Sequence, residues 1–182
     1  MRGLEGMLLY TARMLGQVAL GFLRPPKVNL AKKTVEVGFR CWPIDLDTYL
    51  HMNNANYLRV AELSRWRIFP PSGLMAASMK KGWMFLAVEQ TVKYLKPIGP
   101  FQRYVVSTKM SHKDNKWLLY EHTFQQHPND VKAGQEPVKY AVIDLRAVLK
   151  QRDGKTVRPD ELKEASNWNK DLLTAHEAAT KP

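Results

Sequence analysis

A single apolar helical segment, set among segments that alternate with period two, is the feature that most constrains the fold. A helix with so few polar positions is enclosed by other elements rather than laid on a surface. Asn53 or Asn54 is a favourable N-cap, and Pro70-Pro71 predicts the end of the helix because proline cannot continue the hydrogen-bond ladder. Its apolar residues are Tyr57, Leu58, Ala61, Leu63, Ile68 and Phe69.

The segments on either side of this helix predict antiparallel strands. Alternation of apolar and polar residues with Pro, Gly or Asn at the ends is typical of half-buried strands. Residues 113–116, Lys-Asp-Asn-Lys, have the composition of a hairpin turn. We therefore expect an α+β fold in which one curved antiparallel β-sheet wraps around one long central helix. The expected strands are residues 34–40, 83–95, 103–111, 117–126 and 138–150.

Residues 1–33 form a basic leader with six Lys or Arg and one acid, so they contribute +5 to the net charge of +11. Their periodicity predicts an extra N-terminal amphipathic helix that Pro25-Pro26 ends. Leu4, Leu8, Leu15, Val18 and Phe22 form an apolar stripe, and Arg2, Gly6, Arg13, Gln17 and Arg24 form the opposite stripe.

Several interpretations of this leader fit the sequence. Arg13 interrupts the apolar run, whereas a membrane span needs about 20 apolar residues. The helix could lie on a membrane surface, target an organelle, dock on a partner or pack on its own domain. We divide the chain into the basic helix and linker (1–33), a main domain (34–150) and a polar C-terminal extension (151–182).

Composition narrows the class of protein. With 45% hydrophobic and 25% charged residues, the chain is neither disordered nor a fibrous rod. Its one cysteine, Cys41, excludes an intrachain disulfide and a cysteine-based zinc site, and makes a reducing compartment the default expectation. We expect no metal.

The segment from Asp45 to Tyr57 carries the candidate chemistry. It places two acids and a histidine in the loop before the central helix, whose N-terminus presents free N–H groups and a partial positive charge. A carbonyl placed there would be polarised, and a nearby carboxylate could act as a general base or as a nucleophile. Asp, Thr and Asn are also the usual turn and capping residues, so the loop alone equally fits a structural role.

The same segment resembles the signature of the hotdog-fold acyl-CoA thioesterases of the 4-hydroxybenzoyl-CoA thioesterase type, Asp-x-Asp-x-x-Gly-His-x-Asn-Asn-x-x-Tyr. Within that family, the Leu-His-Met-Asn-Asn variant is most similar to the thioesterase superfamily member 6-like proteins. The resemblance extends over about residues 34–150, where Tyr94 to Ile98 look like the family's strand that ends in a proline-bounded turn. The matching signature positions are Asp45, Asp47, His51, Asn53, Asn54 and Tyr57.

The resemblance implies a hotdog fold, a homodimer and acyl-CoA sites at the dimer interface. Asp47 would be the catalytic carboxylate, with His51 and Asn54 as further catalytic residues. Asn53, Ala55 and Tyr57 would bind substrate. The coenzyme A thioester is the substrate, and no separate cofactor is implied. Leu50 departs from the family's glycine, which indicates a different turn or a blocked pocket.

Two functions follow as hypotheses. The first is hydrolysis of a fatty acyl-CoA or related thioester. The second is a catalytically inactive hotdog domain that serves as a structural subunit of a large mitochondrial or membrane-associated assembly. The basic helix, the polar extension and Leu50 favour the second. We expect a mitochondrial, membrane-associated protein, or alternatively one on the endoplasmic reticulum or the cytoplasmic membrane surface. Residues 1–24 would contact the membrane or assembly, and direct nucleic-acid binding is not expected.

Overall fold

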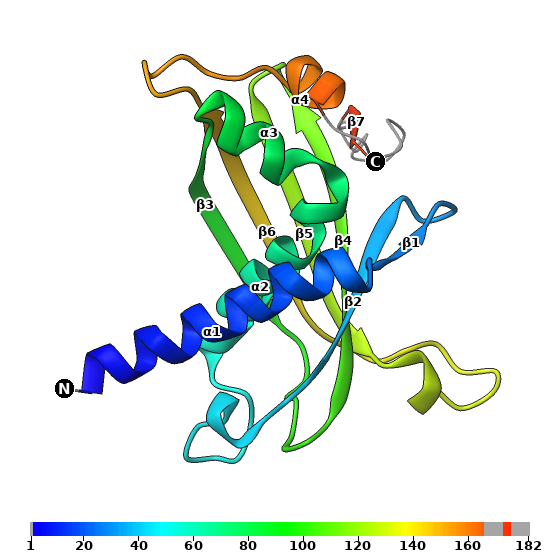
Figure 1. Ribbon diagram of the computed structural model, residues 1–182. Coiled ribbons are helices and arrows are strands. Elements are labelled where there is room, and N and C mark those ends of the chain that lie inside the picture. Colours follow the sequence, from blue (N-terminus) through cyan, green and yellow to red (C-terminus); the bar gives the residue numbers. More distant parts are fainter. Residues whose placement is uncertain (1, 166–172, 176–182) are drawn as a thin grey trace.

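The computed structural model describes residues 2–165 and 173–175, so part of the expected C-terminal extension lies outside the described residues. A twisted sheet, the long helix α2 on one of its faces and the helix α1 across α2 form three successive layers (Figure 1). The elements are α1 (Arg2–Leu23), β1 (Lys27–Asn29), β2 (Thr34–Arg40), η1 (Pro43–Asp45), α2 (Asn54–Ser72), α3 (Leu74–Lys81), β3 (Met84–Tyr94), β4 (Arg103–Lys113), β5 (Trp117–Gln126), η2 (Pro128–Asp130), β6 (Lys139–Lys150), α4 (Pro159–Ala165) and β7 (Leu173–Ala175).

The sheet confirms the expected α+β architecture. Its strand order is β1-β2-β4-β5-β6-β3, all antiparallel, and β7 adds a short parallel pairing to β4. The sheet stays open, with β3 at one end of that order and β1 at the other. The turn between β4 and β5 contains Asp114 and Asn115 with φ of 54° and 44°, the left-handed pair that suits a tight hairpin.

Helix α2 is held against the sheet by an apolar face and a buried polar network. Val60, Leu63 and Ile68 are almost fully buried. The polar network begins at Arg65, also on α2, whose guanidinium lies 3.1 Å from Nε2 of His122 on β5. Because the guanidinium can only donate, Nε2 accepts and Nδ1–H donates to the Thr108 hydroxyl on β4, 2.9 Å away. Burial holds the pKa of His122 well below its usual range, which keeps this imidazole neutral.

The end of α2 differs from the expectation. The helix continues through Pro70 and Pro71 to Ser72 and ends at Gly73, which has a left-handed φ of 76°. Both prolines fit in the last turn, but they cannot donate hydrogen bonds. The carbonyl of Arg67 therefore lacks the donor that residue 71 would otherwise supply.

That carbonyl is where α1 docks. A Cβ built on Gly21 would lie 2.7 Å from the Arg67 carbonyl oxygen and 3.1 Å from Cγ of Pro70, so only glycine allows the two helices to approach this closely. The Arg67 guanidinium donates to the carbonyl of Arg24 at 2.8 Å and to Oε1 of Gln17 at 3.5 Å. Among the interpretations of the leader, the structure shows a helix packed on its own domain.

Replacing Gly21 by alanine tests this close approach. We expect Gly21→Ala to lower the free energy of unfolding by about 1–3 kcal/mol, because the added methyl group overlaps the Arg67 carbonyl. Gly16→Ala is the matched control, since Gly16 is exposed and a Cβ there meets nothing within 4 Å. Alanine's higher helix propensity should make that variant more stable by about 0.5–1 kcal/mol. Chemical denaturation measures the free energy of unfolding of both variants. If Gly21→Ala were stabilised as Gly16→Ala is, the close approach of α1 to the Arg67 carbonyl would be contradicted.

Candidate functional site

The first acid of the motif, Asp45, is a structural residue. Its carboxylate is 1% exposed, accepts a hydrogen bond from the Trp42 N–H at 3.0 Å and forms an ion pair with Arg13 of α1 at 2.6 Å. Its backbone carbonyl accepts from the Asn53 N–H at 2.8 Å and from the Asn56 amide at 3.0 Å. Asp45 therefore joins α1, the motif loop and the start of α2.

The second acid, Asp47, closes a turn and remains partly exposed. Its Oδ1 accepts from the N–H of Tyr49 at 2.9 Å and of His51 at 3.4 Å. Backbone hydrogen bonds from Asp47 N–H to the His51 carbonyl and from Leu50 N–H to the Asp47 carbonyl complete the turn. Both of these side-chain bonds end on Oδ1, so Oδ2 takes no part in the turn.

Leu50 sits within this turn at a φ of 58°, in the left-handed region that a glycine would occupy freely. Leu50 therefore adopts a backbone conformation that is open to glycine and strained for leucine. The side chain is 64% exposed and does not line the neighbouring pocket. It therefore does not block access to Asp47.

The N-terminus of α2 presents fewer free donors than the sequence suggested. The Asn53 side chain is the N-cap and accepts from the Ala55 N–H at 2.9 Å, so that N–H is already used. Asn54 is the first helical residue, and its N–H has no acceptor within the helix. Asn54, rather than Ala55, offers the backbone donor at this end.

One pocket of about 300 Å³ gathers most of the candidate residues. It contains Asp47, His51, Asn54 and Tyr57, whereas Asn53 and Ala55 are not part of its lining. Burial raises the pKa of Tyr57 to about 12, so this phenol is neutral. In the part of the chain that the structure describes, no group of three or more His, Cys, Asp or Glu could hold a metal ion. The remaining lining residues are Tyr49, Met52, Tyr94, Leu95, Lys96 and Pro97.

The wall formed by the end of β3 was not assigned to the site from sequence. The Tyr94 hydroxyl donates to the Asn54 carbonyl at 3.2 Å, and its ring centroid lies 5.3 Å from that of Tyr57. Lys96, two residues after β3, adds a positively charged side chain to the pocket lining. The aromatic-to-proline strand end around Tyr94 was visible as a family resemblance, but its contact with the helix start depends on the folded chain.

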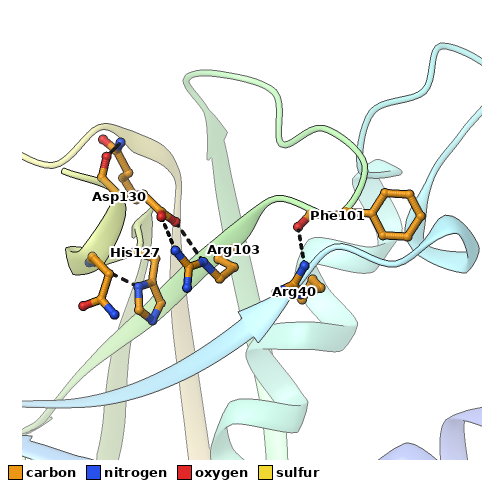
Figure 2. Close-up of polar contacts among 7 residues, drawn as sticks. Arg40, Phe101, Arg103, His127 and Asp130 are labelled. Carbon is orange, nitrogen blue, oxygen red and sulfur yellow. Dashed lines mark hydrogen bonds and ion pairs between the residues drawn. The ribbon is translucent and has the colours of Figure 1, made fainter. Parts of the chain in front are cut away.

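A second polar cluster lies where β2 and β4 meet the segment after β5 (Figure 2). Arg103 forms an ion pair with Asp130, which holds the pKa of that carboxyl below its usual range. Arg40 donates to the Phe101 carbonyl at 3.4 Å. Arg103 is therefore already paired with a carboxylate, and Lys96 is the cation that lines the pocket itself.

Comparisons with known proteins identify the family of this chain. A family model described as "Thioesterase-like superfamily" matches residues 41–171. The chain belongs to this superfamily. It is 27% identical over 112 residues to the "Probable thioesterase YBR096W" of Saccharomyces cerevisiae, covering 61% of this chain and 49% of that one. It is 32% identical over 82 residues to "Protein THEM6" of Xenopus laevis, covering 45% and 40%. The match thus spans half or less of these two relatives' length.

Solved structures establish the fold of this thioesterase-like protein. The "1,4-dihydroxy-2-naphthoyl-CoA thioesterase" Slr0204 from Synechocystis superposes with a TM-score of 0.60 at 12% identity, over 72% of this chain and 94% of that one. At this identity the likeness concerns the fold alone. It confirms the hotdog fold expected from the motif.

Replacing Leu50 tests the strain in the turn. We expect Leu50→Gly to raise the free energy of unfolding by up to about 1 kcal/mol, because relief of a left-handed leucine outweighs the added freedom of the unfolded chain. Thr48→Gly, in the same exposed loop but with an ordinary negative φ, should lower it by about 0.5–1 kcal/mol. Urea denaturation of both variants provides the measurement. If Leu50→Gly and Thr48→Gly lowered the free energy of unfolding equally, the Leu50 conformation would carry no strain.

Proposed function

We propose that this protein hydrolyses an acyl thioester of coenzyme A in the pocket beside Asp47. The observation that carries the proposal is that a partly exposed carboxylate and the N-terminus of α2 face one cavity. Membership of the thioesterase-like superfamily supports the reaction class. The Synechocystis protein of similar fold is a 1,4-dihydroxy-2-naphthoyl-CoA thioesterase, which supports coenzyme A as the thiol carrier.

In the proposed reaction, the thioester carbonyl lies against the start of α2. The Asn54 N–H and the positive end of the helix dipole polarise the carbonyl and stabilise the oxyanion that develops on it. Asp47 either removes a proton from an attacking water or attacks the carbonyl carbon itself. In the first route the carbon–sulfur bond breaks as the proton that Asp47 took from water passes to sulfur, so the acid and the thiol are released. In the second route the thiolate leaves as an acyl–Asp47 anhydride forms, and water then hydrolyses the anhydride and supplies the oxygen of the acid and the proton of the thiol.

Other pocket residues would orient the substrate. His51 and Asn54 lie beside Asp47 in the lining, and the neutral Tyr57 packs its ring against Tyr94. Lys96 is an exposed cation at the rim that suits a phosphate of coenzyme A. Leu95 and Pro97 supply apolar surface for the acyl group or the pantetheine arm.

An acyl-CoA hydrolysis assay with Asp47→Asn tests the proposal. We expect kcat to fall at least 100-fold, because the amide can neither accept the proton nor attack the carbonyl. Asp153→Asn is the matched control, since Asp153 is an exposed carboxylate paired with Lys155 outside the pocket, and it should keep full activity. Thiol release is followed with acyl chains of several lengths. If the unmodified protein never exceeds Asp47→Asn, the non-catalytic structural subunit becomes the better description.

We further propose that two copies pair through β3. This strand ends the sheet, and its exposed edge offers unpaired backbone groups to another strand. Leu86 and Val88 on β3 are large apolar residues that are about half exposed. Tyr94, at the end of the same strand, lines the pocket. Pairing here would cover the apolar edge and bring a second chain beside each pocket.

Charged residues on β3 should separate the two copies. We expect Leu86→Lys/Val88→Lys to convert a dimer to a monomer, because the new charges oppose each other across the paired edge. Val28→Lys/Leu30→Lys, at exposed residues near the opposite end of the sheet, is the control and should leave the mass unchanged. Light scattering coupled to gel filtration measures the mass. A monomeric unmodified protein, or a dimer that survives the β3 change, would contradict pairing through this edge.

A further inference from the structure

Helix α1 is docked with its polar stripe inward and its apolar stripe outward. Arg13 and Gln17 bind Asp45 and Arg67 through their side chains, and Gly21 packs on the Arg67 carbonyl. These residues follow one another at spacings of four along the helix, so they share one face. The apolar stripe predicted from sequence therefore points away from the domain.

The outward face is a large apolar surface. Leu15 is 58% exposed and Phe22 is 64% exposed, although both lie in the middle or last turns of a well-formed helix. Glu5–Leu23 is long and apolar enough to cross a membrane by length and composition, yet only 6% of this stretch is buried. Continuous apolar surface on this scale marks contact with a lipid or a protein. The large exposed apolar residues of α1 are Met7, Leu8, Leu9, Leu15, Leu20, Phe22 and Leu23.

Charge beside this surface favours lipid as the occupant. Directly after α1, Lys27, Lys32 and Lys33 are exposed, and the four charged pairs formed by described side chains do not include them. Exposed lysines that follow an amphipathic helix along the chain match the anionic headgroups above an acyl-chain layer. Arg13, which interrupts the apolar run in sequence, does not oppose this contact, because it faces Asp45 rather than the outer side.

We propose that α1 lies in the plane of an anionic lipid bilayer, with Leu8, Leu15 and Phe22 immersed in the interface. A helix that crossed the bilayer would have to leave the domain, because its contacts run from Arg13 to Arg24. Leaving would deprive the buried Asp45 of its counter-ion. In-plane binding retains every contact seen in the fold, and it is independent of whether the pocket hydrolyses thioesters.

Flotation of the full-length protein with vesicles tests the proposal. We expect binding to vesicles of phosphatidylcholine and phosphatidylserine, and an at least tenfold loss in Leu15→Glu/Phe22→Glu. Ala76→Glu/Met79→Glu on α3 is the matched control, since it adds the same charge at exposed helical positions and should bind normally. Lys32→Glu/Lys33→Glu should weaken binding to the anionic vesicles. The outer-face residues point away from the domain, and unchanged thermal unfolding would show that their variant remains folded.

The flotation experiment would overturn the proposal if the unmodified protein did not float, or if the outer-face variant and its control bound equally. A lipid-free oligomer that Leu15→Glu/Phe22→Glu abolishes would also overturn it, because the face would then be covered by a second copy.

Labelling distinguishes in-plane from spanning binding. A thiol introduced as Glu5→Cys should react with an impermeant maleimide added outside the vesicles, since an in-plane helix keeps its first turn on that side. The natural Cys41 is buried and gives little background. Protection of the new thiol until detergent is added would show a crossing helix and overturn the in-plane arrangement.

Discussion

The buried ion pair between Asp45 and Arg13 is the interaction on which the other parts of this molecule depend. An unpaired carboxylate in the protein interior is strongly unfavourable, so Asp45 requires the guanidinium that α1 supplies. Through its carbonyl, the same residue fixes Asn53 and Asn56 at the beginning of α2. The position of the leader helix, the shape of the motif loop and the start of the central helix are thereby set by one side chain and its backbone.

The two acids of the motif, Asp45 and Asp47, are two residues apart but differ in burial and in the contacts that they make. Asp45 is enclosed and fully engaged, whereas Asp47 has one oxygen in a turn and lies on the lining of a pocket. Leu50 lies in the same turn and has a left-handed backbone conformation. The hydrogen bonds around Asp47 hold it left-handed although leucine opposes this by about 1–2 kcal/mol. The loop is consequently shaped by its hydrogen bonds and not by glycine.

Much of the fold was predictable because it rests on local periodicity. The period-two segments became β2 to β6, and Asn53 proved to be the N-cap of an almost enclosed helix. What could not be predicted depends on contacts between distant segments. The polar stripe of α1 docks because Arg13 pairs with Asp45 and because Gly21 fits closely against the Arg67 carbonyl. Tyr94 and Lys96 joined the pocket because β3 ends beside the first turn of α2.

The order in which the chain is synthesised gives the inverted docking of α1 a further consequence. The residues that receive its polar face, from Asp45 to Pro70, leave the ribosome a few seconds after α1 itself. During that interval both stripes of the helix are exposed, and the apolar stripe is the surface that a chaperone or nascent-chain receptor would recognise. An encounter of the proposed kind with lipid during this interval would precede folding of the domain.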